Sequence, residues 1–281
     1  MAESAQRPPR RPGLHGIYGF RCGPVLVYPA VGLWAKDKGN LQSYNHRPED
    51  IFWGQLSGVT TVVNHAHMTY SPEHAKQGIK NISIFGNPIS LLLHIDPPHP
   101  RVVINLAAPF GDGRVSLCLA VDFDVPYDSV VDLWQKTQVL GIKLLTTHYV
   151  AGFMPNAIQL LSSASQLTSR VLISYGNGIS ELDALTLKPQ DAFVCSTPET
   201  EMQMGLSDPV AFLCDFKSHT CVGVDCHSNN SSDILTQIRL MLQHTRAIRN
   251  THALQSSQYP SVDVHLQEAF NLGTIQGRSG F

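Results

Sequence analysis

The stretch Cys221-Val-Gly-Val-Asp-Cys-His-Ser-Asn-Asn-Ser-Ser-Asp233, together with the periodic segment 234–250 that follows it, predicts a strand, a polar loop and a helix. The first four residues are small or β-branched, which suits a buried parallel strand. The run stops at Asp225, so this carboxylate lies at the C-terminal end of the strand. In parallel α/β folds such a position usually belongs to a ligand-binding or catalytic site. The alternative is that Asp225 only caps the loop or the helix.

The same order of strand, loop and helix repeats along the chain before this stretch. Strands are predicted at 59–64, 82–85, 114–122, 142–148, 171–174, 192–195 and 221–224. Helices are predicted at 47–58, 71–78, 129–140, 155–167, 181–187, 234–250 and 264–274, with a loop turning into a helix at 196–205. The proline-containing segment 88–109 is predicted to be irregular, and the segment 1–45 is poorly defined. About seven alternations predict an α/β fold, a (β/α)8 TIM-like barrel over residues 46–281.

Composition narrows the class of protein. A chain of 281 residues with 43% hydrophobic side chains can bury a large core as one domain. A formal charge of −2 predicts no nucleic-acid partner. The chain contains neither an apolar run long enough to span a bilayer nor a secretory signal at its start, so we expect a soluble, cytoplasmic protein. The six cysteines form no C-x-x-C pair and are predicted to be reduced and mostly buried.

Side chains that can bind a metal follow three of the predicted strands: His65 with His67, then His148, then Asp225. The two histidines of an H-x-H pair on a strand point to the same face, as shared ligation requires. Histidines and a carboxylate that converge at one barrel mouth suit Zn²⁺ or a similar divalent ion, which acidifies a bound water. The alternatives are that the histidine pair lines a pocket and that His148 is structural or contacts substrate.

Three further residues are candidates for substrate binding. Glu199 and Glu201 in the segment 197–201 can contact substrate or carry protons, although acids are also common in the first turn of a helix. His227 follows Asp225 by two residues and can face the same site, or it can be an ordinary loop histidine.

Five stretches together resemble the amidohydrolase superfamily, in particular its chlorohydrolase and cytosine-deaminase-like branch and the fungal members of that branch. They are Gly58-Val-Thr-Thr-Val-Val-Asn-His-Ala-His67, Ser71-Pro-Glu-His74, Asn177-Gly-Ile-Ser180, Ser196-Thr-Pro-Glu-Thr-Glu-Met-Gln-Met-Gly205 and Gly223-Val-Asp225. The resemblance implies a metal-dependent (β/α)8 barrel that hydrolyses C–N or C–Cl bonds. Members usually place H-x-H on the first strand, one histidine each on the fifth and sixth strands, and an aspartate on the eighth.

The resemblance assigns roles to only some of these positions. His148 matches the fifth-strand ligand, and Asp225 matches the eighth-strand ligand, which also takes the proton from the attacking water. His65 and His67 match the second strand, so they line the pocket or substitute for ligands.

Other family positions carry residues that do not match the pattern. The sixth-strand histidine falls on Tyr175, which together with Asn177 is a substrate-binding candidate. The first-strand histidine positions fall on Tyr18 and Phe20, and a common acid falls on Ala151. The chain also stops before the β-sandwich of the relatives, which implies an incomplete or diverged barrel.

The resemblance implies a metal-dependent hydrolase that acts on a C–N bond (amide, cyclic amidine or amine) or a C–halogen bond of a small molecule, with zinc as the expected cofactor. A biosynthetic or catabolic pathway, such as secondary metabolism, is the expected setting. One alternative is a catalytically inactive relative that serves as a binding or scaffold protein. Another is a metal-poor barrel with lyase or isomerase chemistry. Metal content separates the first alternative from the hydrolase.

Overall fold

The computed structural model describes residues 62–66, 89–94, 115–121, 127–139, 141–142, 144–153, 155–206, 210–212, 216–225, 230–231 and 233–276. In 62–66 and 89–94 it describes the backbone and the side chain of Val63. The segment 1–45, the predicted helices 47–58 and 71–78 and the predicted strand 82–85 lie outside these ranges.

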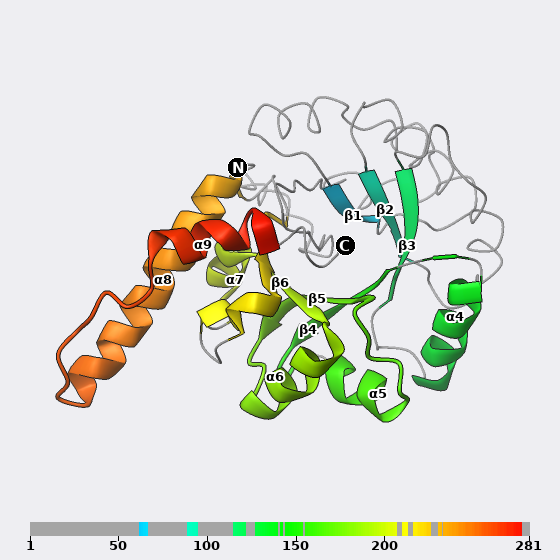
Figure 1. Cartoon of the computed structure of the whole chain (residues 1–281), viewed down its shortest axis with the longest axis horizontal. Helices are drawn as coiled ribbons and strands as arrows, with labels where there is room; N and C mark the ends of the chain where they lie inside the picture. Colours follow the sequence, from blue (N-terminus) through cyan, green and yellow to red (C-terminus); the bar gives the residue numbers. More distant parts are fainter. Residues whose placement is uncertain are drawn as a thin grey trace, which may run out of the picture.

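The described strands form one sheet in which all neighbouring strands are parallel (Figure 1). They are β1 (Val62–Ala66), β2 (Ile89–His94), β3 (Val115–Ala120), β4 (Leu145–Val150), β5 (Val171–Asn177), β6 (Phe193–Ser196) and β7 (Thr220–Val222). Each strand pairs with the next one in the chain, in the order β1 to β7. This singly wound order is that of a (β/α) barrel, so the predicted α/β, TIM-like fold is confirmed as a partial barrel.

The observed strands differ from the predicted ones at several places, and three differences affect the topology or the candidate site residues. The segment 88–109 was predicted to be irregular, but its residues Ile89–His94 form β2, because the prolines flank this apolar run without interrupting it. Strand β1 begins at Val62 and includes His65. Strand β4 continues to Val150, so His148 lies within the strand and not at its end. All six β4 residues are buried, and the strand continues for two residues past the side chain of His148.

Helices follow most of the described strands. They are α4 (Tyr127–Val139), α5 (Ala157–Ser163), α6 (Glu181–Leu187), α7 (Pro198–Met204), α8 (Ile234–Gln255) and α9 (Leu266–Leu272), with short 3₁₀ turns η2 (Lys188–Gln190), η3 (Val210–Phe212) and η4 (Lys217–His219). Helices α5 and α6 pack against each other below the sheet in the view of Figure 1, and α4 lies apart from them at the right. The core between the helices and the sheet includes Trp134, Ile158 and Leu187, each fully buried. None of the helices in the described ranges is long and apolar enough to cross a membrane.

Two of the six cysteines bear out the prediction of buried, reduced thiols. Cys118 in β3 and Cys195 in β6 are buried and are not disulfide-bonded. Cys221 in β7 is disulfide-bonded, so the prediction is wrong for this residue. A chain of this size does not need a disulfide to fold, but this does not prevent one from forming where two cysteines come close.

A buried carboxylate joins α5 to the start of α6. Asp183 is 4% exposed, and its Oδ2 accepts hydrogen bonds from the backbone N–H and the hydroxyl of Ser180. The bond from the Ser180 N–H and the reciprocal bond from the Asp183 N–H to the Ser180 hydroxyl form a capping box. The Oδ1 of Asp183 accepts from the side-chain amides of Asn156 (3.1 Å) and Gln159 (2.9 Å). Burial raises the pKa of Asp183, but these hydrogen bonds together lower it below its ordinary value. The ionised form therefore stabilises the folded state.

We expect Asp183→Asn to reduce the free energy of unfolding by about 1–3 kcal/mol at pH 7, because an amide cannot accept from four donors as a carboxylate does. Since the folded-state pKa is lowered, the contribution is present above the unfolded pKa and is lost as the pH falls through the folded pKa. Urea unfolding at pH 7 measures the loss. Asp132→Asn, which breaks an exposed ion pair with Lys136, is the matched control and should change little. Equal effects of the two variants would contradict the role of Asp183.

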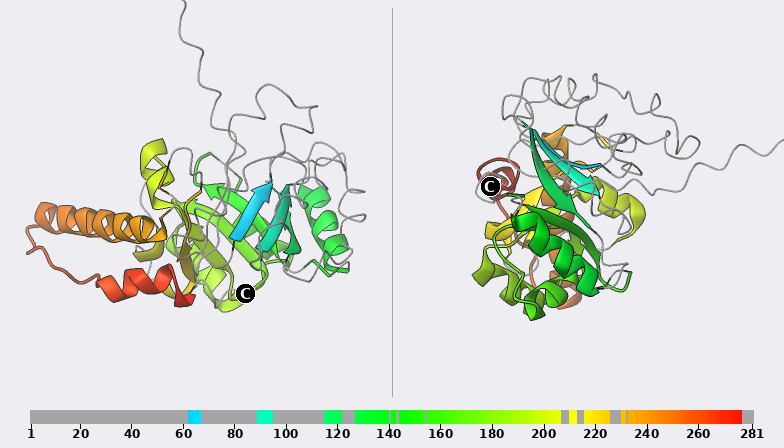
Figure 2. Two further views of the ribbon diagram at one scale, coloured as in Figure 1. Left: turned by 90° about the horizontal axis from the view of Figure 1, so that it is seen from above. Right: turned by 90° about the vertical axis from the view of Figure 1, so that its right-hand side faces the viewer.

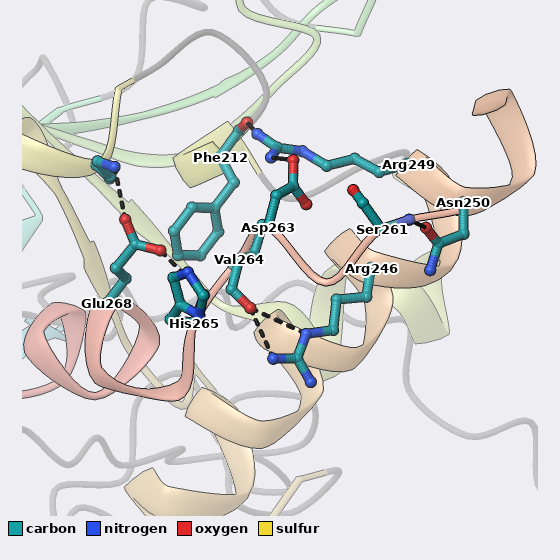
Figure 3. A network of polar contacts seen from close by, with 10 residues as sticks. Phe212, Arg246, Arg249, Asn250, Ser261, Asp263, Val264, His265 and Glu268 are labelled. Carbon is teal, nitrogen blue, oxygen red and sulfur yellow. Dashed lines mark hydrogen bonds and ion pairs between the residues drawn. The ribbon is translucent and has the colours of Figure 1, made fainter. Parts of the chain in front are cut away.

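Helix α8 extends beyond the sheet, and α9 returns alongside it (Figures 1 and 2). The buried residues of α8 all lie between Ile234 and Thr245, within the first twelve of its 22 residues. The second half is held by polar contacts: Arg246 donates to the carbonyl of Val264, and Arg249 forms an ion pair with Asp263 and donates to the carbonyl of Phe212 (Figure 3). These polar contacts, together with the buried side chain of Val264, hold the chain between α8 and α9.

Candidate functional site

Polar side chains gather at the C-terminal ends of strands β4 to β7. His148 lies on β4, Tyr175 and Asn177 on β5, Ser196 ends β6, and Asp225 follows β7 by three residues. All five residues are at most 2% exposed. Because the strands are parallel and adjacent, their C-terminal ends lie at one edge of the sheet, where ligands bind in barrels of this kind. This cluster is the candidate site.

Asp225 is at the centre of the cluster. Its Oδ2 accepts a hydrogen bond from the hydroxyl of Thr200 on α7 at 2.7 Å and one from the phenol of Tyr175 at 3.4 Å. Its backbone is left-handed, with φ of 66°, a conformation in which aspartate is one of the more tolerated residues. Backbone strain of this kind is found preferentially at functional sites. These features favour a functional Asp225 over a simple cap, because Asp233 is the N-cap of α8.

The end of β5 is distorted where it meets Asp225. Tyr149 on β4 pairs with Tyr175, but Val150 pairs with Asn177, so Gly176 is an extra residue in β5. Tyr175 and Gly176 both have left-handed backbones, with φ of 70° and 77°. A bulge of this type redirects the side chains around it. Here Tyr175 contacts Asp225, and Asn177 contacts Glu201.

His148 contacts Tyr175, which also donates a hydrogen bond to Asp225. The rings of His148 and Tyr175 have centroids 5.5 Å apart and are tilted by 36°. His148 is 2% exposed. His148 and Asp225, the two residues that match ligand positions in the resemblance, therefore both contact Tyr175.

Glu201 is fully buried beside the cluster. The hydroxyl of Ser196 donates to both of its carboxylate oxygens, at 2.8 and 2.9 Å, and the backbone N–H of Thr197 donates to Oε1 at 2.6 Å. The amide of Asn177 donates to Oε2 at 3.3 Å. Burial, the largest influence, raises the pKa of Glu201 to about 7, and the negative charge of Asp225 adds to the rise, while these hydrogen bonds oppose it. Glu201 can therefore exchange a proton near neutral pH.

Glu199 has different surroundings, although it is only two residues away. Its Oε2 accepts from the side-chain amide of Gln237 on α8 at 2.7 Å and from the backbone N–H of Ser231 at 2.9 Å. Its own N–H donates to Gln237. These contacts join α7 to α8, so Glu199 serves the packing of the two helices. Its predicted role as a substrate contact stays a prediction.

The side chains of the other predicted site residues, His65, His67 and His227, lie outside the described part of the structure. The backbone of His65 pairs with Leu92 in the register of β1 and β2, but its side chain is not described. His67 and His227 lie outside the described residues. No group of three or more His, Cys, Asp or Glu side chains within the described ranges is placed to hold a metal ion. His148 and Asp225 provide suitable donor atoms, but two ligands are fewer than a catalytic zinc ion normally has.

Thr200 and Asn230, which border the cluster, were not predicted from the sequence, and neither was Ser196 within it. Asn230 is 7% exposed, and its side-chain amide donates to the hydroxyl of Thr200 and to the carbonyl of Val224. Each is a common residue in a segment that also suits a helix start or a loop. Only the pairing of the loop after β7 with α7 reveals their relation to Asp225.

The sequence matches no protein-family model and no curated protein. Solved structures do match. A mutant of atrazine chlorohydrolase from Arthrobacter aurescens TC1, with zinc and atraton bound, aligns with a TM-score of 0.68 at 13% identity over 89% of this chain and 62% of that one. An amidohydrolase from a Sargasso Sea environmental sample gives a TM-score of 0.64 at 13% identity, covering 94% and 66% of the two chains. Guanine deaminase from C. acetobutylicum, with bound guanine, gives 0.67 at 12% identity, covering 94% and 73%.

The chain therefore spans less than two thirds of the length of the chlorohydrolase that it matches. At identities this low the similarity concerns the fold. The structural neighbours of this chain are members of the amidohydrolase superfamily, and the chain shares the architecture of their barrels.

Proposed function

We propose that this chain is a hydrolase of small molecules that cleaves a C–N or C–halogen bond, with Asp225 as the general base for the attacking water. The observation that carries the proposal is the buried Asp225, which is held in a strained backbone conformation at the C-terminal edge of the sheet and oriented by two hydroxyl donors. Strain and burial of an acid at this edge are costly for stability, and they are retained typically where the acid has a function.

Asp225 would take a proton from water as the oxygen attacks the carbon that bears the leaving group. A carboxylate in this role needs hydrogen bonds that orient it, and Thr200 and Tyr175 supply them. Glu201 is a candidate proton carrier, because burial brings its pKa to about 7. The substrate binding expected of Asn177, Tyr175, Glu199 and His227 is part of the same proposal.

The described part of the site provides only some of the ligands that a metal-dependent hydrolase needs. His148 and Asp225 would be two ligands of a divalent cation such as zinc, which the chlorohydrolase neighbour binds. The described residues do not complete a metal site. His65, His67 or His227 would have to supply the remaining ligands.

Metal analysis of the purified protein, combined with an activity screen, tests this function. We expect about one divalent cation per chain, and its loss in Asp225→Ala. The screen uses heterocyclic amines, cyclic amides and heteroaryl halides, with ammonia or halide release as the readout. Activity in metal-free protein would contradict metal dependence but retain Asp225 as the base. Protein that has neither metal nor activity after reconstitution with zinc would contradict the hydrolase.

One observation favours the second candidate, an inactive relative that binds a ligand. Tyr175 occupies the position at which the family has a histidine ligand, and its phenol contacts the carboxylate that a metal would need. A binding protein with this site would keep Asp225 as a ligand contact. It would bind heterocycles in a calorimetric titration without turning them over. The lyase or isomerase alternative has no residue in the described site that favours it.

A further inference from the structure

The hydroxyl of Thr200 lies between Asp225 and Asn230. It is 2.7 Å from Oδ2 of Asp225 and 2.5 Å from Nδ2 of Asn230. Thr200 is 3% exposed and Asn230 is 7% exposed. Thr200 belongs to α7, whereas Asp225 and Asn230 both lie in the connection between β7 and α8.

The direction of both hydrogen bonds follows from a fourth group. The same Nδ2 of Asn230 is 2.7 Å from the carbonyl oxygen of Val224, which can only accept. The nitrogen end of the amide therefore faces Val224 and Thr200, and it donates to both. Thr200 accepts from Asn230, so its single hydroxyl proton is directed to the carboxylate of Asp225.

Asn230 also acts on the backbone of Asp225. The carbonyl of Val224 belongs to the peptide bond that precedes Asp225, whose φ is 66°. A bond from Asn230 to this carbonyl holds the peptide in the orientation that the left-handed residue requires. Gln203 on α7 donates to Oδ1 of Asn230 at 3.1 Å and fixes the amide from its other end. Backbone and carboxylate of Asp225 are thus held through one asparagine.

We propose that Thr200 is the positioning residue for Asp225, with Asn230 setting the direction of its hydroxyl. Thr200 holds Oδ2 and thereby fixes the rotation of the carboxylate relative to the sheet. The proposal deepens the proposed function and rests on it for the claim that a misplaced Asp225 slows a reaction. The claim that Thr200 holds the carboxylate does not depend on activity.

A double-mutant cycle on the full chain tests the structural claim. Thr200→Val keeps the shape of the side chain and removes the hydroxyl. We expect it to raise the unfolding equilibrium constant about tenfold, as the loss of a hydrogen bond to a charged group does. In an Asp225→Gly background, where glycine suits the positive φ, the same change should raise it less than about threefold. Thr200→Ser should stay close to wild type in both backgrounds. Equal effects of Thr200→Val in the two backgrounds would overturn the proposal.

The side-chain amide of Asn230 provides a second measurement if Asp225→Gly does not fold. In Thr200→Val this amide loses one acceptor, so its proton resonance in NMR spectra should move upfield, and Thr200→Ser should restore it. An unchanged resonance in Thr200→Val would also overturn the proposal.

Kinetics tests the functional claim once a substrate is known. We expect Thr200→Val to lower kcat about 10–100-fold, since small misplacements of a catalytic group have such effects, with KM changed much less. Thr236→Val is the matched control, because it removes a threonine-to-aspartate hydrogen bond of 2.8 Å at the N-cap of α8. An unchanged kcat in Thr200→Val would overturn the positioning role. A wild-type protein without activity would instead contradict the proposed function, and the double-mutant cycle would still decide whether Thr200 holds Asp225.

Discussion

Asp225→Asn is expected to lower kcat/KM about 1,000-fold, the loss that removal of a general base typically causes. The asparagine side chain has nearly the same shape as aspartate and can still accept from Thr200 and Tyr175 through its oxygen, so the fold should be retained. Asparagine also tolerates the left-handed backbone that residue 225 adopts. The expected loss is therefore chemical, because an amide cannot take a proton from water near neutral pH.

Steady-state kinetics of the folded variant measures this effect, and circular dichroism confirms the fold. The matched control is Asp191→Asn, a carboxylate that is 78% exposed, binds His219 and precedes β6, whereas Asp225 lies at the C-terminal edge of the sheet. It should leave kcat/KM within about twofold, because substitutions at exposed positions have small effects. An active Asp225→Asn variant would show that another group takes the proton, and Glu201 would then be the first residue to test.

The second large effect is a dependence of stability on pH that comes from Glu201. Burial raises its pKa in the folded protein to about 7, well above that of an unfolded chain. The folded state therefore binds a proton that the unfolded state releases between about pH 4.5 and 7, so the free energy of unfolding falls as the pH rises through this window. Between pH 5.5 and 8 the loss is on the order of 2 kcal/mol, or about 4 °C in the melting temperature.

Glu201→Gln should remove this component, because an amide stays neutral at every pH in the range. The test compares the slope of stability against pH, since the amide also changes the hydrogen bonds with Ser196 and Asn177. Thermal unfolding at several pH values between 5.5 and 8 measures both proteins. Glu181→Gln, at an exposed carboxylate of α6, is the control and should keep the wild-type slope. A wild-type slope in Glu201→Gln would mean that Glu201 is ionised throughout this range.

The fold was predicted from the sequence more completely than the contacts of the candidate site. Helices with clear end signals were predicted well, and α6 has the predicted bounds because Ser180 and Asp183 form a local capping box. Strand β2 was missed because its prolines suggested an irregular segment. The bounds of α6 were predicted correctly and β2 was missed for the same reason: each prediction used the pattern of a few neighbouring residues, which was informative for α6 and misleading for β2.

The two acids of α7 show why the sequence could not identify every residue of the candidate site. Glu199 and Glu201 have the same residue type in one helix, and the sequence treats them alike. In the structure Glu201 is buried, accepts a hydrogen bond from Asn177 and is close enough to Asp225 to be influenced by its charge. Glu199 instead contacts Gln237 and Ser231. Two residues of separation turn the side chains by about 200°, so only the positions of α7 and α8 decide which acid reaches the site.

The sequence by itself determined that strands and helices alternate, that the sheet is parallel, and that Asp225 follows the last predicted strand. These properties arise from the local pattern of apolar side chains and from the order of elements. Only the tertiary structure decided which side chains surround Asp225. Tyr175 reaches it through a bulge in β5, and Thr200 reaches it from α7. These contacts join residues 25 and 50 positions apart, and they require a particular packing of elements and two left-handed backbones that no short-range pattern specifies.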